Sequence, residues 1–356
     1  MGSFDPTNLL RPVTLHSDFN ICFTDFSRKG YLVIPSFLSS EEIQALLTPY
    51  DNLTEITNHN YDIGEIQETA LTIIKTKLTN TIDKVTDSAN ITVSYDGLHA
   101  GYYFASKKVS FGWHQDCESY FATQNHHDYI NFYMPLKKPV KEKGNLSFIP
   151  WDAFKARCPR EYEMLCSTSA AIFFVVNNTT IVIKDEGIVC ELPFDINELA
   201  VTPELEVGDL LLFSGDVIHQ TQDTDTDRVA LSVRFTNPAT TISYRKLLTG
   251  GSLKNNMILQ NWHDFGPMIK AFRTTRKKEL TWQEIRAVKD KLRSNNYSFE
   301  TRGFVRKVIF WAQKVLHGNL LASGLAWIRY KKALEYVKNP KHKRRANSFL
   351  DQTKIL

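Results

Sequence analysis

The sequence lacks the features that mark membrane-spanning and secreted proteins. No uninterrupted apolar run reaches the roughly 18–20 residues that cross a bilayer. The first residues contain no basic segment followed by an apolar one, which is the pattern of a secretory signal. The five cysteines are irregularly spaced and include no C-x-x-C pair, so we expect free thiols in a reducing compartment. These absences predict a cytoplasmic protein, with peripheral attachment to a membrane as the alternative.

Charge is unevenly distributed along a chain of otherwise ordinary globular composition. The 356 residues are 42% hydrophobic and carry a net charge of +4. Residues 270–356 hold 22 Lys and Arg against 6 Asp and Glu, a net +16, so the rest of the chain carries −12. This asymmetry predicts two parts, residues 1–250 and a basic helical extension over 251–356.

The basic extension has two interpretations. It can bind an anionic partner, such as an anionic membrane surface. Alternatively, it can be a solvated helical face that packs on an acidic neighbour. Nucleic acid is disfavoured as a partner because no recognition motif is present.

The pattern of short β-prone runs predicts an α+β fold that is mainly β. Runs of β-branched and aromatic residues recur between about 91 and 236, separated by turn residues such as Asn177-Asn178. Helices are predicted near 40–47, from a capping box of Ser39 and Glu42 to just before Pro49, over 65–87, and over 151–167. From Ser252 onward we expect helices only. One begins at a capping box of Thr281 and Glu284. Another spans 302–337, with Gly318 and Gly324 as breaks or points of close packing and an apolar stripe of Phe304, Val308, Trp311 and Val315. We therefore predict a double-stranded β-helix, or jelly roll, with flanking helices and a helical C-terminal extension.

His114 and Asp116 are the leading candidates for a metal site. In an extended segment, residues i and i+2 point to the same face, so an imidazole and a carboxylate can converge on one ion. A second imidazole would complete a 2-His-1-carboxylate triad, which is diagnostic for non-haem Fe(II) oxygenases. His126 and Asp128 have the same spacing, and the alternative for that pair is a polar loop before a strand.

Four blocks follow one another along residues 26–236: Gly30–Ile43, Trp113–Asp116, Gly144–Pro150, and Gly208–Asp209 with His219 and Arg228 beyond it. In this order they resemble the phytanoyl-CoA dioxygenase family of Fe(II)/2-oxoglutarate-dependent oxygenases. The first H-x-D pair belongs to a block and the second does not. The chain departs from the family pattern after Pro150, where Trp151-Asp152-Ala153 replaces the common Gly-Ser-His.

The resemblance implies the cofactors and their ligands. His114, Asp116 and His219 would hold Fe(II), leaving three adjacent positions for 2-oxoglutarate and O2. Arg228, which opens the strand after His219, would bind the far carboxylate of 2-oxoglutarate, because guanidinium offers a planar fork that stays charged when buried. Arg234 shares its face of that strand and is the competitor.

Two further side chains are candidates for binding 2-oxoglutarate. Ser232 lies on the same face as Arg228 and offers a hydroxyl. Asn131 lies on a neighbouring predicted strand and offers an amide, although a core or turn asparagine is the alternative for it.

The function we predict is hydroxylation of an unactivated C–H bond in a small-molecule or lipid-like substrate by an Fe(II)/2-oxoglutarate-dependent dioxygenase. Alternatives are the same ferryl chemistry leading to cyclisation, desaturation or epimerisation, and a non-catalytic jelly-roll protein that keeps a metal. The resemblance implies a small residue at the position of Asp116 in relatives that halogenate, so halogenation is disfavoured. Aromatic residues near the motif indicate either core packing or an apolar pocket: Tyr102, Tyr103, Phe104, Phe111, Trp113, Tyr120 and Phe121.

Overall fold

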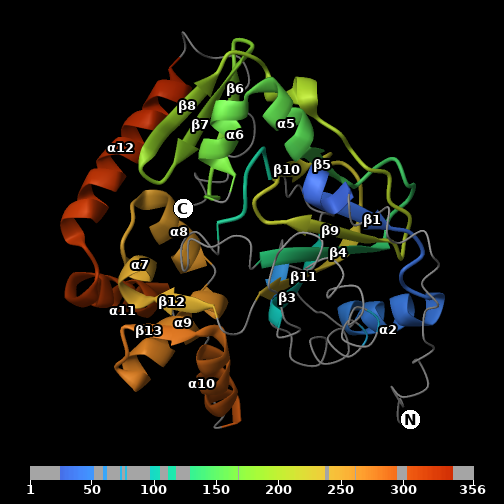
Figure 1. Cartoon of the computed structure of the whole chain (residues 1–356). Coiled ribbons are helices and arrows are strands. Elements are labelled where there is room, and N and C mark those ends of the chain that lie inside the picture. The colour runs from blue at the N-terminus through green and yellow to red at the C-terminus, as the bar shows by residue number, and fades with distance from the viewer. Residues whose placement is uncertain are drawn as a thin grey trace. The chain divides into compact units, whose positions relative to one another are not determined.

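The structure is a computed structural model of the whole chain (Figure 1). It describes residues 25–51, 59–61, 73, 77, 97–104, 111–117, 129–166, 168–236, 240–260, 262–294 and 303–339. Several predictions lie outside these residues: most of the helix over 65–87, the second H-x-D pair, and the end of the basic extension after residue 339. Tyr120 and Phe121 lie outside them as well.

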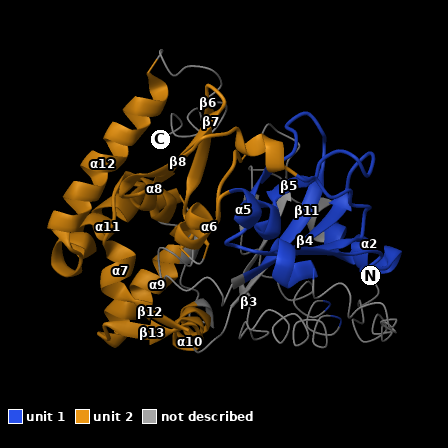
Figure 2. Cartoon of the chain, turned by 45° about the horizontal axis from the view of Figure 1, so that its top comes forward, with its two compact units in different colours: residues 1–110, 127–157, 201–237 blue, residues 111–126, 158–200, 238–356 orange. Residues whose placement is uncertain are grey.

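The chain divides into two compact units, each built from several stretches of sequence (Figure 2). Unit 1 comprises residues 1–110, 127–157 and 201–237, and unit 2 comprises residues 111–126, 158–200 and 238–356. The predicted boundary at residue 250, between a jelly-roll domain and a helical extension, remains a prediction.

Unit 1 contains a six-stranded antiparallel sheet with the order β1-β9-β4-β11-β3-β2. β-prone runs of the sequence form most of its strands, whereas β2 lies in a polar stretch that the sequence does not predict as a strand. Strand β9 is buried at every position, so it lies in the interior of the sheet. Phe213 pairs with Tyr31 on one side and with Asn131 on the other. The strands are β1 (Tyr31–Ile34), β2 (His59–Tyr61), β3 (Gly97–Phe104), β4 (Tyr129–Lys137), β9 (Leu210–Ser214) and β11 (Val229–Thr236).

A second, two-stranded sheet packs on the first and completes the jelly roll. Its strands are β5 (Leu146–Ile149) and β10 (Ile218–Thr221). Phe148 of β5 is fully buried and stacks on Tyr31 of β1, with ring centroids 4.7 Å apart. Residues of both sheets share one hydrophobic cluster, so the inward-facing positions of two antiparallel sheets form the core. The predicted fold class, α+β with a jelly-roll core, is confirmed.

Helix α2 (Ser40–Asp51) begins at the predicted capping box and extends beyond its predicted end. The backbone N–H of Ser39 donates to Glu42 Oε2 at 2.7 Å, and the N–H of Glu42 donates to Ser39 Oγ at 3.3 Å. The predicted stop before Pro49 is wrong. A proline removes one intrahelical hydrogen bond, and here that loss falls close to the end of the helix.

Unit 2 contains a three-stranded antiparallel sheet, β6 (Ile172–Val176), β7 (Thr179–Lys184) and β8 (Gly187–Leu192). The predicted hairpin turn between β6 and β7 is confirmed. Asn177 and Asn178 have φ angles of 50° and 62°, which suits the mirror-image turns that match the twist of a hairpin. Helix α12 (Leu320–Lys338) packs on this sheet through Tyr330, Ala333 and Val337.

The helical stretch predicted over 151–167 forms two short helices, because Pro159 starts the second one. These are α5 (Trp151–Arg157) in unit 1 and α6 (Pro159–Leu165) in unit 2. A short 3-10 helix, η3 (Ile196–Leu199), follows β8 and begins at Asp195, whose carboxylate accepts the N–H of Asn197.

The last hundred residues are mostly helical, with one correction to the prediction. Strand β13 (Glu279–Thr281) pairs with β12 (Thr241–Ser243), so strands do not cease at Ser252. A three-residue strand carries too little periodicity to be seen in the sequence. The helices are α7 (Tyr244–Leu248), α8 (Ser252–Gln260), α9 (Trp262–Thr275), α10 (Trp282–Ser294), α11 (Gly303–His317) and α12.

The predicted helix starts and breaks in this region are largely confirmed. Thr281 and Glu284 form the predicted capping box before α10. The predicted helix over 302–337 breaks at Gly318, between α11 and α12, whereas Gly324 lies inside α12. Among the helices that the structure describes, none has the length and apolar character required to cross a bilayer.

Candidate metal centre

The segment that carries His114 is extended and is held along residues 170–173. The N–H of Gln115 donates to the carbonyl of Ala171, and the N–H of Phe173 donates to the carbonyl of Trp113, both at 2.9 Å. His114 itself forms an antiparallel bridge with Ile172. The alternation of an extended backbone therefore places His114 and Asp116 on one face, as the sequence predicts.

The neighbours on the opposite face fix this segment in the core. Trp113 is buried and its Nε1–H donates to Asn197 Oδ1 at 2.9 Å. Gln115 is buried and its Nε2–H donates to the carbonyl of Leu165 at 3.1 Å. Of the two interpretations of the aromatic residues, core packing rather than an apolar pocket therefore applies to Trp113. Phe111 differs, because its ring lies 5.9 Å from the ring of His114 and is only half-buried.

His219 lies on β10 and is enclosed by aromatic rings. It pairs with Phe148 of β5 in the antiparallel register, and the two rings stack with centroids 6.0 Å apart. Phe213 of β9 meets it edge to face at 4.9 Å. These rings leave the imidazole 5% exposed, so its orientation is set by packing as well as by hydrogen bonding.

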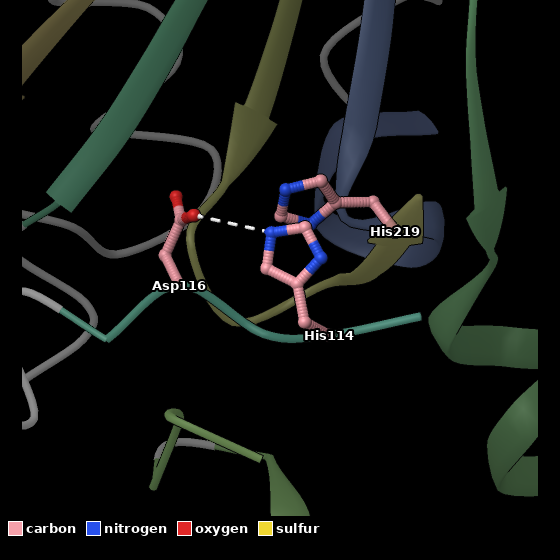
Figure 3. Close-up of side chains that lie close together, drawn as sticks. All are labelled: His114, Asp116 and His219. Carbon is pink, nitrogen blue, oxygen red and sulfur yellow. Dashed lines mark ion pairs between the residues drawn. The ribbon is translucent and has the colours of Figure 1, made fainter. Parts of the chain in front are cut away.

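His114, Asp116 and His219 converge (Figure 3). Each can offer one ligand atom such that all three atoms lie within 4.8 Å of one another. His114 Nε2 is 3.9 Å from Asp116 Oδ1. Among the described residues this is the one group of three or more such side chains placed to hold a metal. The two imidazoles and the carboxylate match the 2-His-1-carboxylate ligand set.

The hydrogen bonds of the two imidazoles fix their tautomers. Nδ1 of His114 lies 2.7 Å from the carbonyl oxygen of Gly112, and Nδ1 of His219 lies 2.9 Å from that of Val217. A carbonyl oxygen only accepts, so each Nδ1 carries the proton and each Nε2 carries the lone pair. Metal-ligating histidines commonly have this arrangement, which also fixes the ring orientation. The residues present therefore fit an iron ion.

Arg228 is buried immediately before β11. Its side chain is 6% exposed, and Nη1 lies 4.0 Å from Asp223 Oδ1. Within the described part of the chain, Nη1 has no hydrogen-bond partner. A buried guanidinium nitrogen in this state favours an anionic ligand, because an unsatisfied buried donor is costly. This observation supports the predicted carboxylate-binding role.

Gly144 makes room for Arg228. It has a φ angle of +68°, and a Cβ added there would lie 3.1 Å from Cδ of Arg228. Its N–H donates to Asp223 Oδ2 at 2.7 Å. Burial alone would raise the pKa of the Asp223 carboxyl, but hydrogen bonds from Gly144 and Thr226 and the charge of Arg228 hold that pKa below its ordinary value.

Ser232 and Asn131 lie at interior positions of their strands. Ser232 is 5% exposed and shares its face of β11 with Ala230, a member of the same core cluster as Phe148 and Phe213. Asn131 is fully buried on β4. Arg234 belongs to β11, but its side chain lies outside the described part of the structure.

Tyr133 is a side chain that the sequence analysis missed. It lies two residues beyond Asn131 on β4, pairs with Ser232, and belongs to the same core cluster. Burial raises the pKa of its phenol, while the charge of Arg228 acts in the opposite direction. The sequence could have indicated Tyr133, because positions i and i+2 of a strand share a face and Asn131 was already a candidate.

Lys138 is a second cation near Arg228. Burial, and then the charge of Arg228, lower the pKa of Lys138 to about 8. Its ammonium donates to Asn145 Oδ1 at 2.5 Å and to the carbonyl of Lys141. Asn145 is fully buried in the Gly144–Pro150 block, so this lysine holds the turn that leads into β5.

A jelly roll that carries two imidazoles and a carboxylate at one point has the architecture of an Fe(II)/2-oxoglutarate-dependent oxygenase. The sequence matches the model of the phytanoyl-CoA dioxygenase (PhyH) family over residues 26–230. The chain belongs to this family. It is therefore an enzyme of the class that uses iron, 2-oxoglutarate and O2, and the predicted family and cofactors are confirmed.

Solved structures with a similar arrangement are distant in sequence. The non-haem α-ketoglutarate-dependent epimerase SnoN from nogalamycin biosynthesis is 13% identical, with 67% of this chain and 86% of that chain covered and a TM-score of 0.43. HygX from Streptomyces hygroscopicus, with nickel and 2-oxoglutarate bound, is 16% identical over 63% and 87%, with a TM-score of 0.41. EctD from S. alaskensis is 14% identical over 67% and 85%, with a TM-score of 0.42. A comparison with curated proteins found no match.

Proposed function

We propose that this protein is an Fe(II)/2-oxoglutarate-dependent dioxygenase that hydroxylates an unactivated C–H bond of a small-molecule or lipid-like substrate. The observation that carries the proposal is the convergence of His114, Asp116 and His219, with ligand atoms within 4.8 Å of one another. The buried Arg228 supports it, because a structural metal site has no need of a second, carboxylate-binding group.

The three side chains have distinct roles in this proposal. His114 and His219 offer Nε2, because each Nδ1–H is engaged by a backbone carbonyl. Asp116 offers a carboxylate oxygen and is 6% exposed. Bound iron would couple the oxidative decarboxylation of 2-oxoglutarate to oxidation of the substrate. The three side chains would hold one face of the ion and leave the remaining positions to 2-oxoglutarate and O2.

Arg228 would orient 2-oxoglutarate by pairing with the carboxylate that does not reach the metal. A guanidinium can form two parallel hydrogen bonds to such a group. Ser232 would add a hydroxyl hydrogen bond from the same strand face, and Asn131 would add its amide. Phe148 and Phe213 pack against His219 and would help to keep water from the site, which strengthens each polar contact.

Hydroxylation is the outcome that we favour for the oxidised substrate. The presence of Asp116 leaves no vacant ligand position for a halide. Cyclisation, desaturation and epimerisation use the same site residues and differ in how the substrate is placed. The half-buried ring of Phe111, beside His114, is the described aromatic side chain placed to contact an apolar substrate.

The first prediction is that the purified protein forms succinate from 2-oxoglutarate under air only when Fe(II) is added. Exchange of His114 for alanine removes one of three ligand atoms, so iron binding and succinate formation should both be lost. Bound iron can be measured by metal analysis after dialysis, and succinate by chromatography. A suitable control is His317→Ala, which removes an exposed imidazole outside the cluster.

Two results would contradict the assignment. Retention of iron and of succinate formation in His114→Ala would show that the metal lies elsewhere. Iron binding by the unaltered protein without any 2-oxoglutarate turnover, in the presence of extract from cells that contain its substrate, would favour the non-catalytic metal-binding alternative.

A further inference from the structure

Helices α11 and α12 carry a concentration of exposed apolar side chains. Eleven of the sixteen exposed large apolar residues in the described part of the chain lie between residues 304 and 328. Phe304 is 78% exposed, Leu321 is 76% exposed and Leu316 is 70% exposed. We call this set the α11–α12 apolar face: Phe304, Val305, Val308, Trp311, Val315, Leu316, Leu320, Leu321, Leu325, Trp327 and Ile328.

The apolar face points away from the body of unit 2, because other residues of the same helices are buried. Helix α11 buries Phe310, Gln313 and Lys314. Helix α12 buries a stripe of mostly small residues at three- and four-residue steps: Ser323, Ala326, Tyr330, Ala333 and Val337. The stripe predicted from sequence, Phe304, Val308, Trp311 and Val315, is therefore the outward face of α11. A helix of a globular protein ordinarily turns its apolar stripe inward.

Polar contacts hold the helix pair in this orientation. The buried ammonium of Lys314 donates to the carbonyls of Leu248 and Gly250 and to Asn255 Oδ1, at 2.8–3.0 Å. Asn319, between the two helices, caps α12 by accepting the N–H of Ala322 and donates its own N–H to Thr249 Oγ1. The apolar face is thus presented by anchored helices, since turning it inward would leave Lys314 unpaired.

Basic side chains far outnumber acidic ones along α11 and α12 themselves. Lys307, Arg329, Lys331 and Lys332 are charged and largely exposed, and Glu335 is the only Asp or Glu between residues 303 and 345. The sequence continues with basic residues at 341 and 343–345. Lys331 Nζ lies 4.3 Å from the ring centroid of Trp327, so a basic side chain directly contacts an aromatic ring of the apolar face.

We propose that the α11–α12 apolar face binds the surface of an anionic phospholipid bilayer. The apolar side chains would enter the boundary between headgroups and acyl chains, and the surrounding Lys and Arg would contact lipid phosphates. Trp311 and Trp327 are 46% and 45% exposed, which suits tryptophan at a membrane interface. A second copy of the chain fits less well, because a symmetric contact would bring the same basic borders together.

The test is sedimentation of the full-length protein with vesicles. Phosphatidylcholine vesicles that contain phosphatidylserine should carry the protein into the pellet, and vesicles of phosphatidylcholine alone should carry less of it. Added salt should release part of the bound protein, because it screens the lysines and arginines. Tryptophan emission should shift to shorter wavelength on binding and become protected from an aqueous quencher.

Variants separate the apolar and the basic contributions. Leu321→Glu and Phe304→Glu should each lower the partition coefficient about tenfold to a hundredfold, the value of burying one large apolar side chain. Lys332→Glu should lower it by about fivefold or more for the lost positive charge. Two variants serve as controls. Val140→Glu changes an apolar side chain that is 47% exposed in unit 1, and Lys155→Glu reverses the charge at an exposed position of α5. Thermal unfolding of all variants should remain unchanged.

The proposal is overturned if the protein stays in the supernatant with anionic vesicles. It is also overturned if Leu321→Glu and Val140→Glu bind vesicles equally. Sedimentation equilibrium without lipid tests the alternative that a second copy of the chain covers the face. The face joins two copies if the unaltered protein forms an oligomer, Leu321→Glu dissociates it, and neither protein binds vesicles.

Discussion

The protonation of two ring nitrogens decides what His114 and His219 can do. Both Nδ1 atoms meet a carbonyl oxygen two residues earlier in the chain, at 2.7 Å and 2.9 Å. The same local geometry therefore occurs twice, on two unconnected segments. It leaves Nε2 of each ring to offer its lone pair to a metal ion. The sequence pattern selects these two histidines from the ten in the chain, but it does not indicate which ring nitrogen carries the proton.

Arg228 gives the second prediction. Exchange for alanine removes the guanidinium that we assign to the far carboxylate of 2-oxoglutarate. The KM for 2-oxoglutarate should rise by about tenfold to a hundredfold, the value of one or two charge-assisted hydrogen bonds. Iron binding should be unaffected, because the metal-ligand atoms belong to other residues. The measurement is succinate formation as a function of 2-oxoglutarate concentration, together with metal analysis.

Two matched variants sharpen the test of Arg228. Arg228→Lys keeps the charge and loses the planar fork, so its KM should lie between those of the unaltered protein and Arg228→Ala. Arg245→Ala removes an exposed arginine of unit 2 and should change neither value. Loss of iron in Arg228→Ala, with unchanged KM, would refute the proposed role.

At the scale of elements, a buried carboxylate joins the β6–β8 sheet to the C-terminal helices. Asp185 follows β7 and is 1% exposed. It accepts the N–H groups of Gly251, Leu253 and Lys254 at the start of α8. These are donors that a helix leaves unsatisfied at its first turn. Burial raises the pKa of this carboxyl, with the backbone hydrogen bonds acting against that shift.

The third prediction concerns this cap. Asp185→Ala should lower the free energy of unfolding of the protein by about 2–3 kcal/mol, since it leaves buried backbone donors without their charged acceptor. Asp195→Ala is the control, because Asp195 caps the short η3 helix at a half-buried position and should cost about 1 kcal/mol or less. Urea unfolding followed by circular dichroism measures both. Equal losses would show that burial of the cap contributes nothing.

At the scale of the whole molecule, buried lysines make stability depend on pH. Burial lowers the pKa of Lys254 to about 7 and that of Lys314 to about 8. In the unfolded chain both ammonium groups have the ordinary pKa of 10.5. Between these values the unfolded state binds more protons than the folded state, so the free energy of unfolding rises with pH.

The fourth prediction is therefore an increase in stability from pH 7 to about pH 8.5. Each lysine contributes at most about 1.4 kcal/mol per pH unit. Above about pH 9 the increase should become shallower, because burial raises the pKa of the Cys190 thiol from 9.0 to about 11 and that of Tyr244 from 10.0 to about 12. Such groups favour the unfolded state once they ionise there. Chemical denaturation at a series of pH values provides the measurement.

Lys254→Met supplies the comparison for the pH series. It removes the group with the lower pKa and keeps a long apolar stem, so the rise between pH 7 and 8.5 should become shallower. Lys332→Met, at an exposed position of α12, should leave the slope unchanged. A slope that is the same in Lys254→Met and in the unaltered protein would contradict the assignment.

The sequence by itself was sufficient for several strands and for the H-x-D pair. Strand periodicity is local, so β4, β6, β7 and β11 appear in the residues that form them, as do the two capping boxes. The extended backbone around His114 also places Asp116 on the same face without further information. The order of the blocks identified the family and the partner His219.

Tertiary structure decided the features that depend on contacts between distant segments. Strand β13 exists because it pairs with β12, the core role of Trp113 depends on Asn197, and the interior position of Tyr133 depends on the second sheet. The stripe on α11 is equally amphipathic whether it faces inward or outward, and the anchoring of Lys314 decides that it faces out. Local patterns specify elements, whereas the burial of a face is a property of what packs against it.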